Sequence, residues 1–198
     1  MEYIKGWWFT TTDRKLPHGD NRQIRIGRTH KVKGEITPCK RGLHLSRKLL
    51  DALKYAPGPV VYKVQGSGTI ISHGNPIDKY VCSERTYLAG GVDATEVLRK
   101  FARLCALDVV HLWDAPDVVI EYLKTGKEDL MSEASAVASA AASASASATA
   151  SAAAWSAANA AAWSEASTAA NNAAWSEASA EARKKQNRRL TRMVKRAF

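Results

Sequence analysis

Residues 43–64 have the sequence LHLSRKLLDALKYAPGPVVYKV, in which a strand, a helix and a second strand are predicted to follow one another. Leu43 and Leu45 alternate with His44, so the two leucines should share one face of a strand and the histidine the other. Ser46 is a favourable N-cap for the next segment, where leucines recur at helical spacing until a Pro-Gly pair. The Val-rich run after that pair predicts a buried strand. The stretch therefore requires a fold with both strands and helices.

Strand patterns dominate the chain on both sides of this stretch. Residues 3–11 are aromatic and β-branched and predict a first strand, which a turn-forming segment at residues 17–21 follows. Residues 23–26 alternate apolar and polar and predict a second strand. After a turn at residues 66–68, residues 68–72 predict a further strand. The N-terminal half is therefore expected to be rich in strands.

Helical signals follow. Asp93 and Glu96 have capping-box spacing, which predicts a helix over residues 94–106. Its inward side is expected to hold Val97, Leu98, Phe101, Leu104 and Cys105. A second helix should begin around Pro116 and end at Gly126, because proline is favoured in the first turn and glycine just past the last. Strands followed by helices predict an α+β domain over residues 1–131.

A four-residue repeat fills residues 132–182. Alanine stands at every fourth position from Ala134 to Ala182. Alanine is the strongest helix former, so we expect a long α-helical arm. A silk-like strand where serine and alanine alternate, and a disordered tail, are the alternatives. Because four residues advance about 400° around a helix, the alanine stripe turns about 40° with each repeat, which argues against an ordinary coiled coil.

Small side chains bury little apolar area, so the arm needs larger anchors and a partner surface. Trp155, Trp163 and Trp175 are the predicted interaction residues, and the partner is a second copy, another protein or the chain's own domain. Beyond the arm, residues 183–198 predict a basic amphipathic helix. Its apolar side should hold Leu190, Met193, Val194 and Phe198.

Charge is spread unevenly along the chain. The net charge is +10, with a local +9 in residues 1–63, −3 in residues 64–131 and +4 in the remainder. Two basic zones favour an anionic partner, and we expect nucleic acid or a ribonucleoprotein. An ordinary solvated surface explains the same charges equally well. The residues predicted to contact nucleic acid are Arg25, Arg28, Lys31, Lys33, Lys40, Arg41, Arg183, Lys184, Lys185, Arg188, Arg189, Arg192, Lys195 and Arg196.

Several site and targeting classes are not expected. Cys39, Cys82 and Cys105 are odd in number and widely spaced, so neither a metal site nor a disulfide framework is predicted. Established nucleotide-binding, metalloprotease and nucleophile-elbow motifs are absent from the sequence. The N-terminal residues lack a signal-peptide pattern and no run is apolar enough for a transmembrane segment. A cytoplasmic location is the expectation.

Three segments carry a family resemblance: GLHLSRKLLDALKYAPG (residues 42–58), DATEVLRKFARLCAL (93–107) and HLWDAPDVVIEYLKTG (111–126). Together they resemble an uncharacterised family of phage and bacterial proteins, in which this domain is commonly followed by Ala-rich repeats containing tryptophan. The resemblance covers residues 5–130 and implies a phage or prophage origin, hence the host cytoplasm, but no established activity. From the basic zones and the tail we expect a phage-type accessory binding protein that acts in host takeover or counter-defence, without a cofactor.

A second resemblance implies an enzyme. The strand–helix–strand stretch around His44 is similar in outline to the cores of ADP-ribosyltransferases and RNA 2′-phosphotransferases. Carried over, His44 would face the nicotinamide side of NAD or a phosphate, and Ser46 would follow it in the motif. Arg25 or Arg28 would substitute for an early-strand His or Arg, where this chain has Trp8, and Glu84 would be the acid that polarises the ribose. The alternative is that His44 is a strand histidine bonded to neighbouring backbone.

Overall fold

The structure is a computed structural model that describes residues 2–17, 20–144, 153–154, 157–158 and 180–198. Contacts divide the chain into two compact units. The first comprises Met1–Thr95 with Leu190–Phe198, and the second comprises Glu96–Arg189. The boundaries expected from composition at residues 131 and 182 stay predictions.

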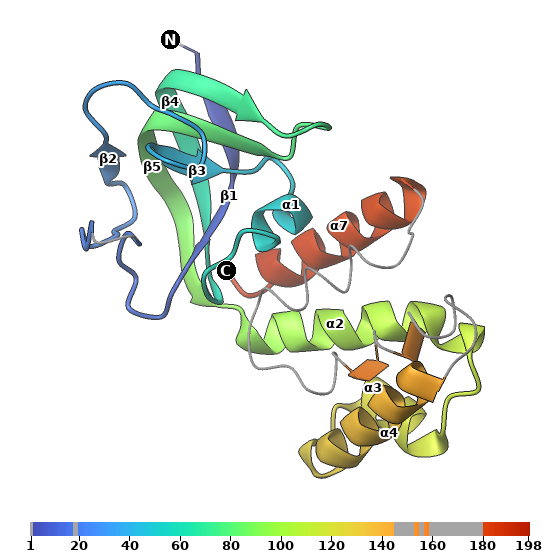
Figure 1. Cartoon of the computed structure of the whole chain (residues 1–198). Coiled ribbons are helices and arrows are strands. Elements are labelled where there is room, and N and C mark those ends of the chain that lie inside the picture. Colours follow the sequence, from blue (N-terminus) through green and yellow to red (C-terminus); the bar gives the residue numbers. More distant parts are fainter. Residues whose placement is uncertain (1, 18–19, 145–152, 155–156, 159–179) are drawn as a thin grey trace. The chain divides into compact units, whose positions relative to one another are not determined.

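An antiparallel sheet forms the first unit. Its elements are β1 (Ile4–Thr10), β2 (Thr29–Lys31), β3 (Leu43–Leu45), α1 (Leu49–Leu53), β4 (Val60–His73) and β5 (Lys79–Asp93). The strand order is β1-β4-β5-β2, and β3 also pairs with β5. Figure 1 shows the long strands β4 and β5 side by side, and β2 and β3 pair with successive parts of β5. The α+β class predicted from the sequence is confirmed for this part of the chain.

Two predicted strands of this unit form as expected. β1 lies within residues 3–11, and β3 has Leu43 and Leu45 on its buried side, with 5% and 2% of their surface exposed. The strand predicted at residues 23–26 is wrong. Only an isolated bridge between Lys15 and Gln23 forms there, because this segment folds back on the loop just before it instead of on the sheet.

The predicted turn at residues 66–68 is also wrong, since β4 continues across it as one strand with an irregular register. Gly68 adopts a φ of +74°, and a Cβ there would lie 2.2 Å from the Ser83 hydroxyl, so the glycine permits a bulge without ending the strand. The capping role predicted for Ser46 is wrong as well. Its backbone exchanges two hydrogen bonds with Trp7, and α1 begins three residues later with Lys48 as its N-cap.

An apolar core supports the sheet. Its buried members are Ile4, Leu16, Ile24, Leu43, Leu45, Val60, Tyr62, Val64, Cys82 and Tyr87. They come from all the strands of the sheet except β2, and from the loop after β1. This loop therefore packs on the sheet even though it forms no strand of its own.

Helices make up the described part of the second unit. They are α2 (Thr95–Val109), η1 (Val110–Leu112), α3 (Asp117–Thr125), η2 (Glu128–Leu130), α4 (Met131–Ala144) and the first part of α7 (Ala180–Lys195). The predicted helices α2 and α3 are confirmed. Leu98, Phe101 and Cys105 are buried on α2, and Gly126 ends α3 in the left-handed conformation, donating its N–H to the Tyr122 carbonyl at 2.7 Å.

The alanine repeat packs closely where the structure describes it. Ala134, Ala138 and Ala142, three consecutive repeat positions, lie on α4 and expose at most 3% of their surface. Ala154 and Ala158, at the same positions of later repeats, are equally buried. Trp155, Trp163 and Trp175 lie outside the described residues, as does most of the predicted arm. The helix and the buried alanine stripe are therefore established for α4.

The predicted C-terminal helix forms as α7 and begins at Ala180. Leu190 and Val194 are fully buried, Gln186 is buried one turn before them, and Phe198 is exposed by 46%. Among the helices of the described residues, none is both long and apolar enough to cross a membrane.

Candidate anion-binding cavity

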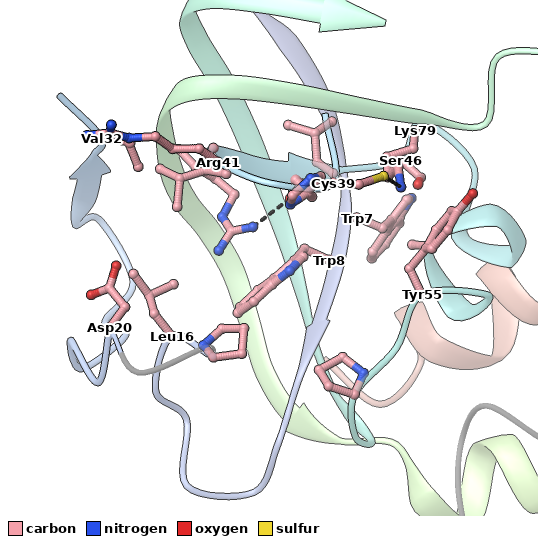
Figure 2. A pocket seen from close by; sticks show the side chains of 18 of the residues that line it. Trp7, Trp8, Leu16, Asp20, Val32, Cys39, Arg41, Ser46, Tyr55 and Lys79 are labelled. Carbon is pink, nitrogen blue, oxygen red and sulfur yellow. Dashed lines mark hydrogen bonds between the residues drawn. The ribbon is translucent and has the colours of Figure 1, made fainter. Parts of the chain in front are cut away.

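A cavity of about 760 Å³ lies in the first unit. Its lining comes from β1, β3, α1 and β5, together with the loops that precede β2 and β3. Figure 2 shows Trp8 in the middle of the lining, with Leu16 and Asp20 on one side and Trp7 and Tyr55 on the other. Trp7, Trp8 and Tyr55 therefore give the wall an aromatic part.

Arg85 of β5 supplies a fixed positive charge to this wall. Its guanidinium carbon lies 3.7 Å from the centroid of the Trp8 ring. Nε and Nη2 donate to the Tyr87 hydroxyl at 3.3 and 2.8 Å, and Nη1 donates to the His44 carbonyl at 2.5 Å. The side chain is 1% exposed, and no carboxylate of the described residues lies within ion-pair distance of it.

The Tyr87 hydroxyl connects Arg85 to His30 of β2 in a buried hydrogen-bond network. The Tyr87 hydroxyl accepts two hydrogen bonds from Arg85, which can only donate, so its own proton must go to His30 Nδ1, 3.1 Å away. Neutral His30 therefore carries its proton on Nε2. Burial, assisted by the nearby cations Arg22, Arg28 and Arg85, lowers the pKa of His30, while Asp20 opposes the shift. The network thus favours a neutral imidazole.

Lys79, at the start of β5, is a second buried cation of the lining. Its side chain is 7% exposed, and Nζ lies 4.1 Å from the centroid of the Tyr55 ring. Nζ also donates to Cys39 Sγ at 3.2 Å, the contact drawn beside Tyr55 in Figure 2. Exposed Lys40 and Arg41 continue the positive charge to the surface.

Asp20 is the acidic residue of the cavity lining. Arg22 binds both of its carboxylate oxygens, at 2.5 and 2.7 Å, and this hydrogen bonding lowers the pKa of Asp20. Its charge is therefore largely satisfied by Arg22, and Arg85 and Lys79 determine the character of the inner wall.

The residues predicted for catalysis do not come together. His44 lines the cavity from β3, but Arg28 is exposed and outside the lining. Glu84 also lies outside it, where it forms an ion pair of 2.7 Å with Lys31. In the register of β2 with β5, Lys31 pairs with Glu84 and His30 with Arg85, so Glu84 and Arg85 lie on opposite faces.

The sequence reasoning did not identify Arg85, Lys79 or Tyr87. Their signal was the segment 79–93, which contains β-branched and aromatic residues but also charges and a pair of glycines, and for which no strand was predicted. Recognition of a strand there would have shown that Arg85 and Tyr87 share a face. The spacing of two between Arg85 and Tyr87, a charged residue and an aromatic one on the same face of a strand, is the sequence signal that indicates the site.

The residues predicted to bind nucleic acid are distributed over several surfaces. Lys40 and Arg41 line the cavity, whereas Arg25, Lys31 and Lys33 are exposed outside it. The exposed members on α7 are Arg183, Lys184, Lys185, Arg188, Arg192 and Lys195, and Arg196, just after the helix, is exposed as well. Arg189 differs, since it forms an ion pair of 2.9 Å with Asp108 within the second unit. In the described residues, no group of three or more His, Cys, Asp or Glu side chains could hold a metal ion.

Comparisons with known proteins bear on the same segment. Residues 10–100 match the model of a domain of unknown function, DUF7666. No curated protein and no solved structure matches the chain. The match agrees with the resemblance to an uncharacterised family, and it contains all of the cavity lining except Trp7 and Trp8. The phage origin and the likeness to ADP-ribosyltransferases stay predictions.

Proposed function

We propose that the first unit binds a phosphate-bearing compound with a planar ring, that is, a nucleotide, either free or as an accessible part of a nucleic acid. The observation that carries the proposal is Arg85, which lies buried in the cavity wall without a described carboxylate partner. Burying a guanidinium is costly unless hydrogen bonds and an opposite charge compensate it. An anionic ligand in the cavity would supply that charge.

Arg85 also has the donors for such a ligand. A guanidinium has five N–H groups, and three of them donate to Tyr87 and to the His44 carbonyl. Two N–H groups therefore remain among the described contacts, one on each terminal nitrogen. Guanidinium N–H groups are strong donors to phosphate oxygens. The stacking on Trp8 and the bonds to Tyr87 hold the guanidinium in place before the ligand arrives.

The aromatic side chains of the cavity support the second part of the proposal, a ligand with a planar ring. Bases stack on aromatic side chains with little dependence on sequence. Trp8, Trp7 and Tyr55 all line the cavity, and Tyr55 also contacts Lys79. A ligand with an anionic group and a flat ring would therefore use both features of the wall.

The basic surfaces extend the proposal to larger partners. The exposed cations around β2 and on α7 would attract a nucleic acid or a ribonucleoprotein through its phosphates. We propose for the whole chain a phage-type accessory role in which the cavity reads a nucleotide, the basic residues strengthen attachment, and the Ala-rich arm assembles copies or partners.

Isothermal titration with AMP, adenosine and inorganic phosphate tests the cavity. AMP should bind, and adenosine should bind at least about 10-fold more weakly, because charge-assisted hydrogen bonds contribute about 1.5–3 kcal/mol. Arg85→Met should lose a similar factor for AMP. Arg28→Met is the matched control, since Arg28 is exposed outside the lining. Equal affinity for AMP and adenosine, or equal losses in the two variants, would refute the proposal.

One observation favours a second candidate, the ADP-ribosyltransferase. His44 lines the cavity next to Ser46, as that resemblance implied. The acid it implied, Glu84, is on the other face of β5 and paired with Lys31. Incubation with NAD decides the matter: nicotinamide release that His44→Gln abolishes would support the enzyme, and NAD recovered intact would remove it.

A further inference from the structure

Cys39 lies at the tip of a tight turn between β2 and β3. Thr37 and Arg41 close this turn, with the Thr37 N–H donating to the Arg41 carbonyl at 2.8 Å. Cys39 itself has a φ of +63°, a left-handed conformation that is strained for a residue with a side chain. Strained backbone of this kind is concentrated at functional sites, where the surrounding structure holds it. The turn presents the Cys39 thiol as part of the cavity lining.

Two groups with chemical roles contact this sulfur. His73, the last residue of β4, has Nε2 3.8 Å from Cys39 Sγ. On β5, Lys79 donates from Nζ to the same sulfur at 3.2 Å. Lys79 is buried and, among the described residues, makes no ion pair. A base and a cation thus converge on one thiol at the edge of a cavity, although the three residues come from separate elements.

The other two cysteines of the chain are expected to be unreactive and provide a comparison for Cys39. Cys82 and Cys105 are buried in the cores of their units, and burial raises the pKa of Cys82 to about 11 and that of Cys105 to about 12. Because the thiolate is the reactive form, these two should react slowly near neutral pH. They serve as internal references for Cys39, which is exposed.

We propose that Cys39 is the nucleophile of an acyl-transfer site, with His73 as its base and Lys79 as the cation beside the sulfur. The Cys39 thiol gives its proton to His73 Nε2 as Sγ attacks a carbonyl carbon. A C–S bond forms, the bond from that carbon to the leaving group breaks, and a thioester remains on Cys39. The proton on His73 passes to the leaving group. Water then cleaves the thioester in the reverse sense, returning the thiol and releasing the acid.

The charges around the thiol indicate the substrate class. Lys79, Lys40 and Arg85 all line the same cavity, so an acyl donor carrying a negative charge, such as an acyl phosphate, fits better than a neutral ester. This preference for an anionic donor rests on the proposed function, because the same cations recognise the phosphate. The reactivity of Cys39 toward acyl groups does not depend on it.

The test measures acetylation of the full chain by p-nitrophenyl acetate, which is neutral, and by acetyl phosphate, which is anionic. Mass spectrometry with peptide mapping locates the acetyl group, and neutral hydroxylamine identifies a thioester because it cleaves thioesters and leaves amides. Near pH 7 we expect Cys39 to react at least about 10-fold faster with either donor than N-acetylcysteine does, since a free thiol is only a few per cent thiolate there. Cys82 and Cys105 should stay unmodified.

His73→Gln keeps the size and polarity of the side chain but cannot take up a proton near neutral pH. It should remove the acceleration and change the pH profile of acetylation, while His111→Gln, at an exposed position of the second unit, should change neither. The proposal is overturned if Cys39 reacts no faster than N-acetylcysteine, or if the two histidine variants behave alike. Cys39→Ser should abolish thioester formation. AMP binding is measured separately on the unmodified wild-type chain, so failure of the acyl chemistry and failure of nucleotide binding are separate results.

Discussion

Acidification should destabilise the first unit through His30. This histidine is 2% exposed, and its Nδ1 accepts a hydrogen bond from the Tyr87 hydroxyl. The cations Arg22, Arg28 and Arg85 are nearby. A proton on Nδ1 would face a Tyr87 oxygen whose lone pairs are already used by Arg85, so two donors would meet. Protonation of His30 should therefore disturb the bonds that fix Arg85 in the cavity wall.

The direction and size of the change in unfolding free energy follow from the link between proton binding and folding. The pKa of His30 is lowered from 6.5 in the folded unit, so the unfolded chain takes up the proton first as the pH falls. The stabilisation from neutral His30 is complete above pH 6.5 and is lost as the pH falls toward the folded pKa. One such group changes the free energy of unfolding by at most about 1.4 kcal/mol per pH unit. Between pH 6.5 and 5.5 the expected loss is therefore at most about 1 kcal/mol. Asp20 and Glu84, whose pKa values are lowered from 3.8 and 4.5, do not titrate in this range.

Native-state hydrogen exchange of the β4 and β5 amides reports on the first unit alone. We expect wild-type protection to fall between pH 7.5 and 5.5, after correction for intrinsic exchange, and AMP affinity to fall with it. His30→Asn retains a polar atom near the Nδ1 position but does not titrate, so its protection should be level across this range. His111→Asn, an exposed control, should follow the wild type. A level wild-type curve, or a His30→Asn curve with the wild-type slope, would refute the reasoning.

Two further predictions concern the second unit. Ala138→Leu should lower the free energy of unfolding by about 1–3 kcal/mol, because Ala138 is fully buried on α4. Ala140→Leu, at an exposed position of the same helix, should change it by less than about 0.5 kcal/mol. Urea unfolding of the two variants measures the difference. Replacing three exposed cations of α7 by glutamine should flatten the dependence of single-stranded RNA binding on salt by about two units of log–log slope, measured by fluorescence anisotropy; three substitutions elsewhere in the unit should leave it unchanged. The α7 set is Lys184, Lys185 and Arg188, and the control set is Lys100, Lys124 and Lys127. An unchanged slope in the α7 variant would contradict the predicted role of these cations.

The elements that could be predicted from the sequence are those with local signals. Asp93 accepts from the backbone N–H of Thr95 at 2.9 Å, and Gly126 takes the left-handed conformation that ends a helix, so the ends of α2 and α3 are marked within a few residues. The alanine repeat likewise predicted a helix over the residues of α4, and the structure shows that every fourth alanine is buried there. In each case the residues that specify the element lie within it or directly next to it.

β5 lacked such a signal, although it is the strand that pairs with three others. Its sequence, KYVCSERTYLAGGVD, mixes charges and glycines with apolar residues. Strand preference depends strongly on neighbouring strands, and β4, β2 and β3 supply pairing that no short window of sequence contains. Lys79, Arg85 and Tyr87 went unrecognised for this reason, and with them the cationic part of the cavity.

The face that a strand residue occupies decides the chemistry of this cavity. Glu84 was the natural choice for an acid, because an acidic residue was needed after His44 and it stood in a plausible segment. Register places Glu84 opposite Lys31 and its neighbour Arg85 opposite His30, so the residue one position later is the one that reaches the cavity. A shift of one residue along a strand exchanges its two faces. Here that exchange replaces a carboxylate by a guanidinium, so the wall lacks the acid that would polarise a ribose and carries instead the cation on which the proposed phosphate binding rests.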